Sequence, residues 1–252
     1  MKKILFFLAT VSLFVACSEN AITGRKQLAL FGEATLQQQA LTEYQSFLSQ
    51  NKVVNSSSNK DAEMVKRVGN RISKAITDYY TQKGLGSELN GYKWEFNLVD
   101  SKEVNAWCMP GGKVVVYTGL LGITQNEAAL AVVMGHEITH AVAHHGNERM
   151  SQGALAQGLE IVGNIATANN PKYNDLFNNI FAPTAQIAVL LPNSRNQEYE
   201  ADHLGLNFAA MAGYNPNEAV AFWQRMAAAS NGQRPPEFLS THPGDENRIA
   251  RL

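Results

Sequence analysis

The sequence predicts an α+β protein that is mostly helical, with one small, mainly antiparallel sheet. Three observations lead to this prediction. Apolar residues recur at helical spacing over most of the chain, and a short central stretch alternates with a period of two. The string His136-Glu137-Ile138-Thr139-His140 then follows this stretch, inside an alanine- and valine-rich run. With 252 residues, 45% hydrophobic and 17% charged, the chain can form one sizeable domain.

The N-terminus is typical of a secretory signal peptide, because Lys2 and Lys3 precede an apolar run that is too short to span a membrane. Phe14-Val15-Ala16-Cys17 is similar to a bacterial lipobox, although Phe14 stands where leucine is usual. This similarity implies cleavage before Cys17 and a lipid anchor on it; a secreted protein with an incidental cysteine is the alternative. Ser18 favours the outer membrane under enterobacterial sorting rules. We therefore expect a signal peptide (1–16), a tether (17–32) and a single domain (33–252).

The charge of the chain argues against a nucleic-acid partner. Without Lys2 and Lys3, 19 basic residues face 22 acidic ones, and the basic residues form no stripe along the sequence. If Cys17 carries lipid, Cys108 has no partner for an internal disulfide bond. We therefore expect Cys108 to be a small core residue.

Apolar spacing predicts two helices and three strands before the H-E-x-x-H string. The first helix is Glu33–Gln50, and the second begins after a serine-rich break with Asp61 as its N-cap. The strands are the alternating stretch Trp94–Leu98, then Val104–Met109 and, after a Pro110-Gly111-Gly112 turn, Lys113–Thr118.

The rest of the chain is expected to be helical. The predicted helices are Gln125–Met150, which carries the H-E-x-x-H string, Ser151–Asn169, Ser194–Ala212, Pro216–Ala229 and a short terminal helix, Gly244–Leu252. Asn170–Asn193 mixes asparagine, proline and apolar runs, and it is either a mobile loop or a helix that flanks a cleft.

The H-E-x-x-H string has the spacing of a metal site. On a helix, His136 and His140 lie on one face about 6 Å apart, so both imidazoles can reach one metal ion. Glu137 can then take a proton from a water at the open metal position. The alternative is two histidines on an ordinary helix surface. His144 lies about 40° around the helix from His140 and is a conceivable but redundant ligand, whereas His145 lies about 180° from His136 and cannot share the site. We expect both to be helix-packing or surface residues.

A third ligand is expected because catalytic zinc usually has three protein ligands. Ser194–Gly205 offers Glu198 and Glu200, which lie about 200° apart on a helix and cannot both face one metal ion. Glu198 shares a face with Asp202, so Glu198 could bind the metal while Asp202 accepts the free N–H of a ligand histidine. The alternative is a solvated acidic helix face.

These motifs resemble the zinc peptidases of the HtpX, BepA and CAAX prenyl endopeptidase family, which includes mitochondrial OMA-type enzymes. The H-E-x-x-H string followed by E-x-x-x-D in Glu198–Asp202 carries the resemblance. The other similar strings are Thr23-Gly24-Arg25, Asn105-Ala106, Pro110-Gly111-Gly112, Ala143-His144-His145-Gly146 and Ser240-Thr241-His242-Pro243. The similarity is to the soluble periplasmic and lipoprotein branch. We expect neither the membrane bundle of HtpX nor the tetratricopeptide domain of BepA.

The resemblance implies a gluzincin-like zincin domain with one zinc ion per chain. Zinc would be held by His136, His140 and Glu198, with Glu137 as general base and Asp202 orienting a ligand. Arg195 and His242 are alternative donors to the tetrahedral oxyanion, and His242 could instead block the fourth zinc position in a resting state. Asn105 and Ala106 are expected to contact an extended peptide substrate.

The expected function is that of a lipid-anchored zinc endopeptidase on the bacterial cell envelope, facing the periplasm, that cleaves misfolded or stalled envelope proteins. A second possibility is a zinc-containing chaperone or assembly factor that works with the outer-membrane assembly machinery and cleaves rarely. Only the enzyme needs Glu137, so its substitution distinguishes the two.

Overall fold

The computed structural model describes residues 17–167, 182–229, 238 and 242, with the backbone alone at 159–167 and 182–193. In chain order the elements are β1 (Cys17–Glu19), β2 (Lys26–Leu28), α2 (Glu33–Gln50), α3 (Lys60–Gln82), η1 (Gly86–Leu89), β3 (Glu95–Val99), β4 (Ala106–Met109), β5 (Lys113–Tyr117), α4 (Thr118–Thr124), α5 (Glu127–Val142), α6 (His145–Thr167), α8 (Ala182–Met211) and α9 (Glu218–Ala229). The predicted α+β, mostly helical fold is confirmed. The signal peptide and the terminal helix Gly244–Leu252 lie outside the described residues.

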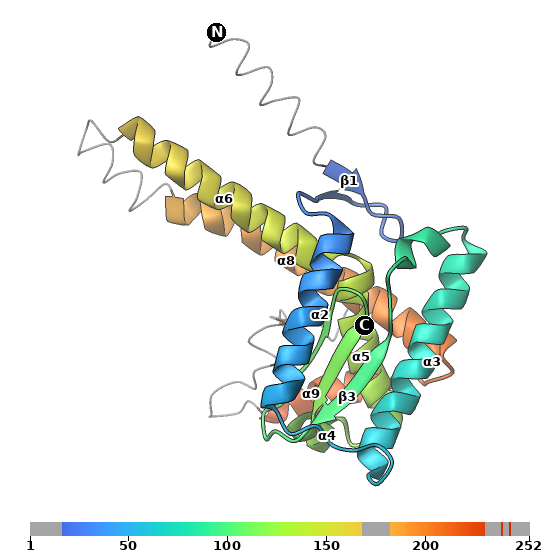
Figure 1. Cartoon of the computed structure of the whole chain (residues 1–252). Helices are drawn as coiled ribbons and strands as arrows, with labels where there is room; N and C mark the ends of the chain where they lie inside the picture. The colour runs from blue at the N-terminus through green and yellow to red at the C-terminus, as the bar shows by residue number, and fades with distance from the viewer. Residues whose placement is uncertain (1–16, 168–181, 230–237, 239–241, 243–252) are drawn as a thin grey trace.

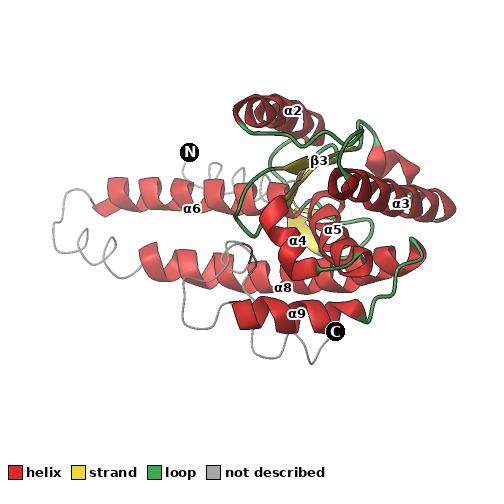
Figure 2. Ribbon diagram, turned by 90° about the horizontal axis from the view of Figure 1, so that it is seen from below, coloured by secondary structure: helices red, strands yellow, loops and turns green. Residues whose placement is uncertain are grey.

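The elements form layers around a three-stranded sheet (Figures 1 and 2). Helix α2 covers one face of the sheet, and α3 and α5 cover the other, with α8 and α9 beyond α5. Helices α6 and α8 run side by side away from the body as a long arm. Among the described residues, each helix is too short or too polar to span a lipid bilayer.

The sheet has the order β3-β5-β4. β4 and β5 form the expected antiparallel hairpin, whose turn has Gly111 and Gly112 at positive φ. β3 pairs with β5 in parallel, with Phe96 opposite Val114. The alternation of apolar residues predicted β3, and the β-branched residues after the Pro110-Gly111-Gly112 turn predicted β5, but neither pattern carries information on strand direction. β4 lies at one edge of the sheet.

Two helix predictions need correction. Asn59, not Asp61, is the N-cap of α3, since its side chain accepts the backbone N–H groups of Asp61 and Ala62. The predicted helix Gln125–Met150 is two helices, α5 and α6. His144 has a φ of 56°, and this left-handed residue breaks the helix after Val142.

The expected tether also differs from the structure. Residues 17–28 form the β1–β2 hairpin, which packs against the end of α5. The side chains of Asn20 and Gln27 both donate to the carbonyl of Ala143, each at 2.9 Å. These contacts join residues more than 100 positions apart, so local periodicity could not reveal them.

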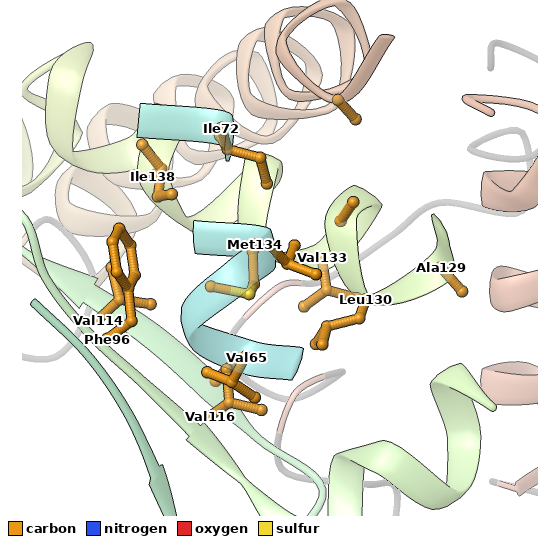
Figure 3. Packing of buried hydrophobic residues seen from close by; sticks show 14 of the residues in the cluster. Val65, Ile72, Phe96, Val114, Val116, Ala129, Leu130, Val133, Met134 and Ile138 are labelled. Atoms are coloured by element: carbon orange, nitrogen blue, oxygen red, sulfur yellow. The ribbon is translucent and has the colours of Figure 1, made fainter. Parts of the chain in front are cut away.

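Helix α5 is the centre of the hydrophobic core, and all its residues from Ala129 to Val142 are buried. Figure 3 shows its apolar side chains packed together with those of α3 and of the sheet. The residues in this contact are Val65, Ile72, Phe96, Val114, Val116, Leu130, Val133, Met134 and Ile138. Each fully buried large side chain contributes about 1.5–3 kcal/mol, so the core fixes the position of α5 firmly.

Two glycines let α5 and α8 approach closely. A Cβ atom on Gly135 would lie 2.5 Å from the carbonyl oxygen of Gly205, and one on Gly205 would lie 2.7 Å from the backbone nitrogen of His136. Only residues without a side chain fit such a crossing. The crossing brings the face of α8 that carries Glu198 and Asp202 against the histidines of α5.

Candidate metal centre

Four buried side chains converge between α5, α8 and the segment that contains His242. Their ligand atoms, from His136, His140, Glu198 and His242, all lie within 4.8 Å of one another. His136 Nε2 is 3.1 Å from His140 Nε2 and 3.2 Å from His242 Nδ1. The Glu198 oxygens are 3.3 to 3.4 Å from the three histidines.

These separations fit a tetrahedral metal site. Donor atoms that surround a common centre at zinc distances, about 2.0–2.1 Å, lie about 3.3–3.4 Å apart at the corners of a tetrahedron. The donor chemistry fits as well. His136 Nδ1 is 2.9 Å from Asp202 Oδ1, so in the neutral form that binds a metal Nδ1–H donates to Asp202 and the lone pair of Nε2 faces the other three groups. A cation satisfies such a convergence of lone pairs.

Burial and the contacts within the centre shift the pKa values of its side chains. Burial alone would lower the pKa of His136, but its contacts with Asp202 and Glu198 raise that pKa to about 9. Burial would raise the pKa of Glu198, but its contacts with His136 and His242 lower it instead. Burial and the proximity of His136 lower the pKa of His140, so His140 is neutral and keeps a lone pair for a metal.

Glu137 lies beside the centre without belonging to it. Its Oε1 is buried, has no hydrogen-bond partner among the described residues and is 3.4 Å from His242 Nε2. Burial raises the pKa of this carboxyl. A buried carboxylate oxygen of this kind is poised to accept a proton from a molecule that enters the site.

His242 comes from a distant part of the sequence and is held by Phe238. Its backbone N–H donates to the carbonyl of Phe238, and the two rings stack with centroids 4.7 Å apart. The backbone N–H of Phe238 donates in turn to the carbonyl of Val104, just before β4. His242 therefore reaches the centre from the side of the edge strand.

The other predicted site residues lie farther from the centre. Asn105 and Ala106 are buried at the start of β4, where the Asn105 side chain accepts the backbone N–H of Ala106. Arg195 is exposed on α8, three residues before Glu198. Cys17 is exposed on β1, and Cys108 packs partly buried against the core.

Three residues on the Nδ1 side of the His140 ring were not predicted to support the centre: His145, Glu200 and Arg25. His145 Nδ1 is 2.9 Å from His140 Nδ1, and His145 Nε2 is 2.9 Å from Glu200 Oε2. Arg25 contacts Glu200 from the hairpin. The prediction that His145 points away assumed one straight helix, and the break at His144 turns this side chain back toward His140.

The part of the chain that carries this centre is similar in sequence to known proteins. The pattern of Peptidase family M48 matches residues 66–252. The chain is 35% identical over 166 residues to the mitochondrial metalloendopeptidase OMA1 of Arabidopsis thaliana, covering 66% of this chain and 32% of that protein. It is 32% identical over 256 residues to the mitochondrial metalloendopeptidase OMA1 of Bos taurus, covering 97% of this chain and 47% of that protein.

A bacterial relative is the β-barrel assembly-enhancing protease of Escherichia coli (strain K12). It is 31% identical over 185 residues, which cover 69% of this chain and 38% of that protein. The chain thus spans between about a third and a half of these relatives. Since the family pattern covers most of the chain and both H-E-x-x-H and the ligand-bearing helix α8 lie within it, the chain belongs to Peptidase family M48.

Proposed function

We propose that this protein is a zinc-dependent endopeptidase. The observation that carries the proposal is the buried group of His136, His140, Glu198 and His242, with Glu137 Oε1, which has no hydrogen-bond partner among the described residues, beside it. Membership of family M48 and the metalloendopeptidase names of its relatives support the same function. Zinc is the metal that fits best, because its usual ligands are nitrogen and carboxylate oxygen in a tetrahedron.

Glu137 is the general base in this proposal. A zinc ion on His136, His140 and Glu198, with the fourth position open, would polarise both a water molecule and the carbonyl of the peptide bond. Glu137 accepts the proton of the attacking water at Oε1 and returns it to the amide nitrogen as the C–N bond breaks. Its burial suits both steps, since the raised pKa lets it hold the proton between them. During both steps Asp202 accepts the Nδ1–H of His136 and so keeps the His136 ring in place.

His242 supports a latent resting state. Its Nδ1 lies 3.2 Å from His136 Nε2 and 3.3 Å from both Glu198 oxygens, which is the position of a fourth ligand. A histidine in that position excludes the water that hydrolysis needs. If His242 leaves the fourth ligand position, its ring is still close enough to donate a hydrogen bond to the oxyanion. His242 is better placed for this role than Arg195, which is exposed. A His242→Ala variant with unchanged zinc content and higher peptidase activity supports the latent state, whereas unchanged or lower activity contradicts it.

The proposed location is the bacterial cell envelope. Its support is the lipobox-like sequence before Cys17, and Cys17 is exposed, as acylation requires. Misfolded or stalled envelope proteins are the proposed substrates, and the name of the bacterial relative connects that protein with β-barrel assembly. Mass spectrometry of the membrane fraction tests the anchor: an acylated Cys17 at the N-terminus supports it, and an unmodified cysteine contradicts it.

Casein hydrolysis with and without a zinc chelator tests the activity. Hydrolysis that the chelator stops and that zinc restores supports the proposal, and chelator-insensitive hydrolysis contradicts it. Rescue of outer-membrane clients in cells by Glu137→Gln would instead indicate a chaperone or assembly factor that holds its clients without cutting them.

A further inference from the structure

The N-terminal hairpin is joined to the helices around the metal centre through Arg25, a residue that takes no part in the proposed hydrolysis. Arg25 lies in the turn between β1 and β2. Asn20 Oδ1 accepts the backbone N–H groups of Ile22 and Thr23, and Thr23 Oγ1 accepts that of Arg25. The turn is therefore held by its own side chains, and it presents the guanidinium in one direction.

The guanidinium of Arg25 joins α6 to α8. Its Nη1 and Nη2 donate to the two oxygens of Glu148 at 2.6 and 2.7 Å. Its Nε donates to Glu200 Oε1 at 2.6 Å, and Nη2 also reaches Glu200 Oε2 at 3.1 Å. The buried carboxylate of Glu148 also accepts from Gln197, the residue before the ligand Glu198. Only the planar fork of an arginine can satisfy both carboxylates in this way.

A directed chain of hydrogen bonds continues from Glu200 to His140. The Nε2 of His140 faces the metal centre, so the proton of the neutral ring is on Nδ1. This Nδ1–H donates to His145 Nδ1, and the Nε2–H of His145 donates to Glu200 Oε2. Arg25 fixes the position of Glu200, which fixes the ring of His145 and, through it, the ring and tautomer of His140. Asp202 does the same for His136 directly.

The hairpin also stabilises the helix break at His144, which places His145 between Glu200 and His140. Asn20 and Gln27 both donate to the carbonyl of Ala143, next to the left-handed His144. With the break in place, His145 is completely buried against His140.

We propose that Arg25 is a positioning residue of the metal centre, acting on His140 through Glu200 and His145. The proposal rests on the metal site of the proposed function. Loss of such a support behind a metal-binding histidine lowers metal affinity about 10- to 100-fold. The hairpin that follows Cys17 is accordingly part of the active centre, although it lies more than 100 residues before the ligands in the sequence.

The test is the zinc dissociation constant of the full-length protein, measured by competition with a chromophoric chelator. Arg25→Gln is expected to weaken zinc binding about tenfold or more and to change the visible spectrum of the cobalt-substituted protein. Arg25→Lys keeps the charge opposite the buried Glu148 and the partly buried Glu200, but not the planar fork. It is expected to weaken zinc binding as well, and it replaces Arg25→Gln if that variant does not fold. Arg67→Gln is the matched control, because Arg67 forms a similar fork with Glu127 at the start of α5, away from His140. It is expected to leave the affinity within twofold of the wild type.

A double-variant cycle separates positioning from general destabilisation. If Arg25 acts through His145, the pair Arg25→Gln and His145→Phe weakens zinc binding no more than His145→Phe alone. Fold losses that multiply overturn the proposal, as does a folded Arg25 variant whose affinity is within twofold of the wild type. A wild-type protein that binds no zinc overturns the proposed metal site itself, and this inference with it.

Discussion

Gly205 tests whether the close crossing of α5 and α8 positions the metal ligands. A Cβ atom at this residue would lie 2.7 Å from the backbone nitrogen of His136 and 2.8 Å from the carbonyl carbon of Gly135. Both neighbours are backbone atoms of a fully buried helix, so neither can rotate away. In Gly205→Ala the two helices must move apart.

The structure gives the size of this effect. The shortest contact is about 0.7 Å closer than the 3.4 Å at which ordinary contact begins. Overpacking of this kind costs about 1–3 kcal/mol, which exceeds the gain of about 0.5–1 kcal/mol from replacing a helical glycine by alanine. Because His136 lies on one side of the crossing and Asp202 on the other, the movement also lengthens their 2.9 Å contact. We expect zinc affinity to fall at least tenfold.

Urea denaturation of the metal-free protein measures the first effect, and chelator competition measures the second. Gly122→Ala in α4 is the matched control, since a Cβ atom there meets nothing within 4 Å. It should leave the free energy of unfolding unchanged or raise it by up to about 1 kcal/mol. A Gly205→Ala protein as stable as the Gly122→Ala protein, with wild-type zinc affinity, would show that the close crossing of α5 and α8 does not position the metal ligands.

Three further substitutions probe other parts of the structure. Burial alone would lower the pKa of His144, but pairing with Glu33 raises it, and the same pairing lowers the pKa of Glu33. The pairing therefore stabilises the fold most between about pH 4.5 and pH 6.5 and is lost as the pH rises through the raised pKa of His144. His144→Asn, which tolerates the left-handed backbone, should cost about 0.5 kcal/mol at pH 6 and less at pH 9 in urea denaturation; an equal cost at both would contradict the pairing. Asp202→Ala should weaken zinc binding about 10- to 100-fold in chelator competition, and unchanged binding would remove Asp202 from the centre. Leu130→Ala should lower the free energy of unfolding by about 2–5 kcal/mol, and a loss below about 1 kcal/mol would show that the core around α5 is loosely packed.

The spacing of residues in the sequence was sufficient to predict features that the pattern of a single helix defines. The helix Glu33–Gln50 has the predicted bounds, because one apolar stripe and flanking breaks define it. Helical geometry also separated Glu198 from Glu200: the first lies in the metal group and the second points to Arg25 and His145. In both cases the deciding sequence pattern falls within a few turns of one helix, although the contacts of Glu198 and Glu200 are with distant segments.

The remainder depends on contacts between distant parts of the chain. The helix break at His144 is stabilised by Asn20 and Gln27, and no spacing near His144 shows it. The parallel pairing of β3 with β5 depends on the crossing of the chain between them, which alternation does not report. The second half of Asn170–Asn193, left open between loop and helix, belongs to α8 from Ala182 onward.

The decisive measurement is peptide hydrolysis by the zinc-loaded protein, compared with Glu137→Gln at equal zinc content. It tests whether the protein is a zinc-dependent endopeptidase with Glu137 as its general base. Glu137 lies beside the ligands but outside the ligand group, so its substitution should leave zinc binding near one equivalent per chain. We expect casein hydrolysis by the wild type to rise with added zinc up to that equivalent, and hydrolysis by Glu137→Gln to be at least 10²-fold slower, roughly the contribution of a general base. A Glu137→Gln protein that hydrolyses casein at the wild-type rate would contradict it.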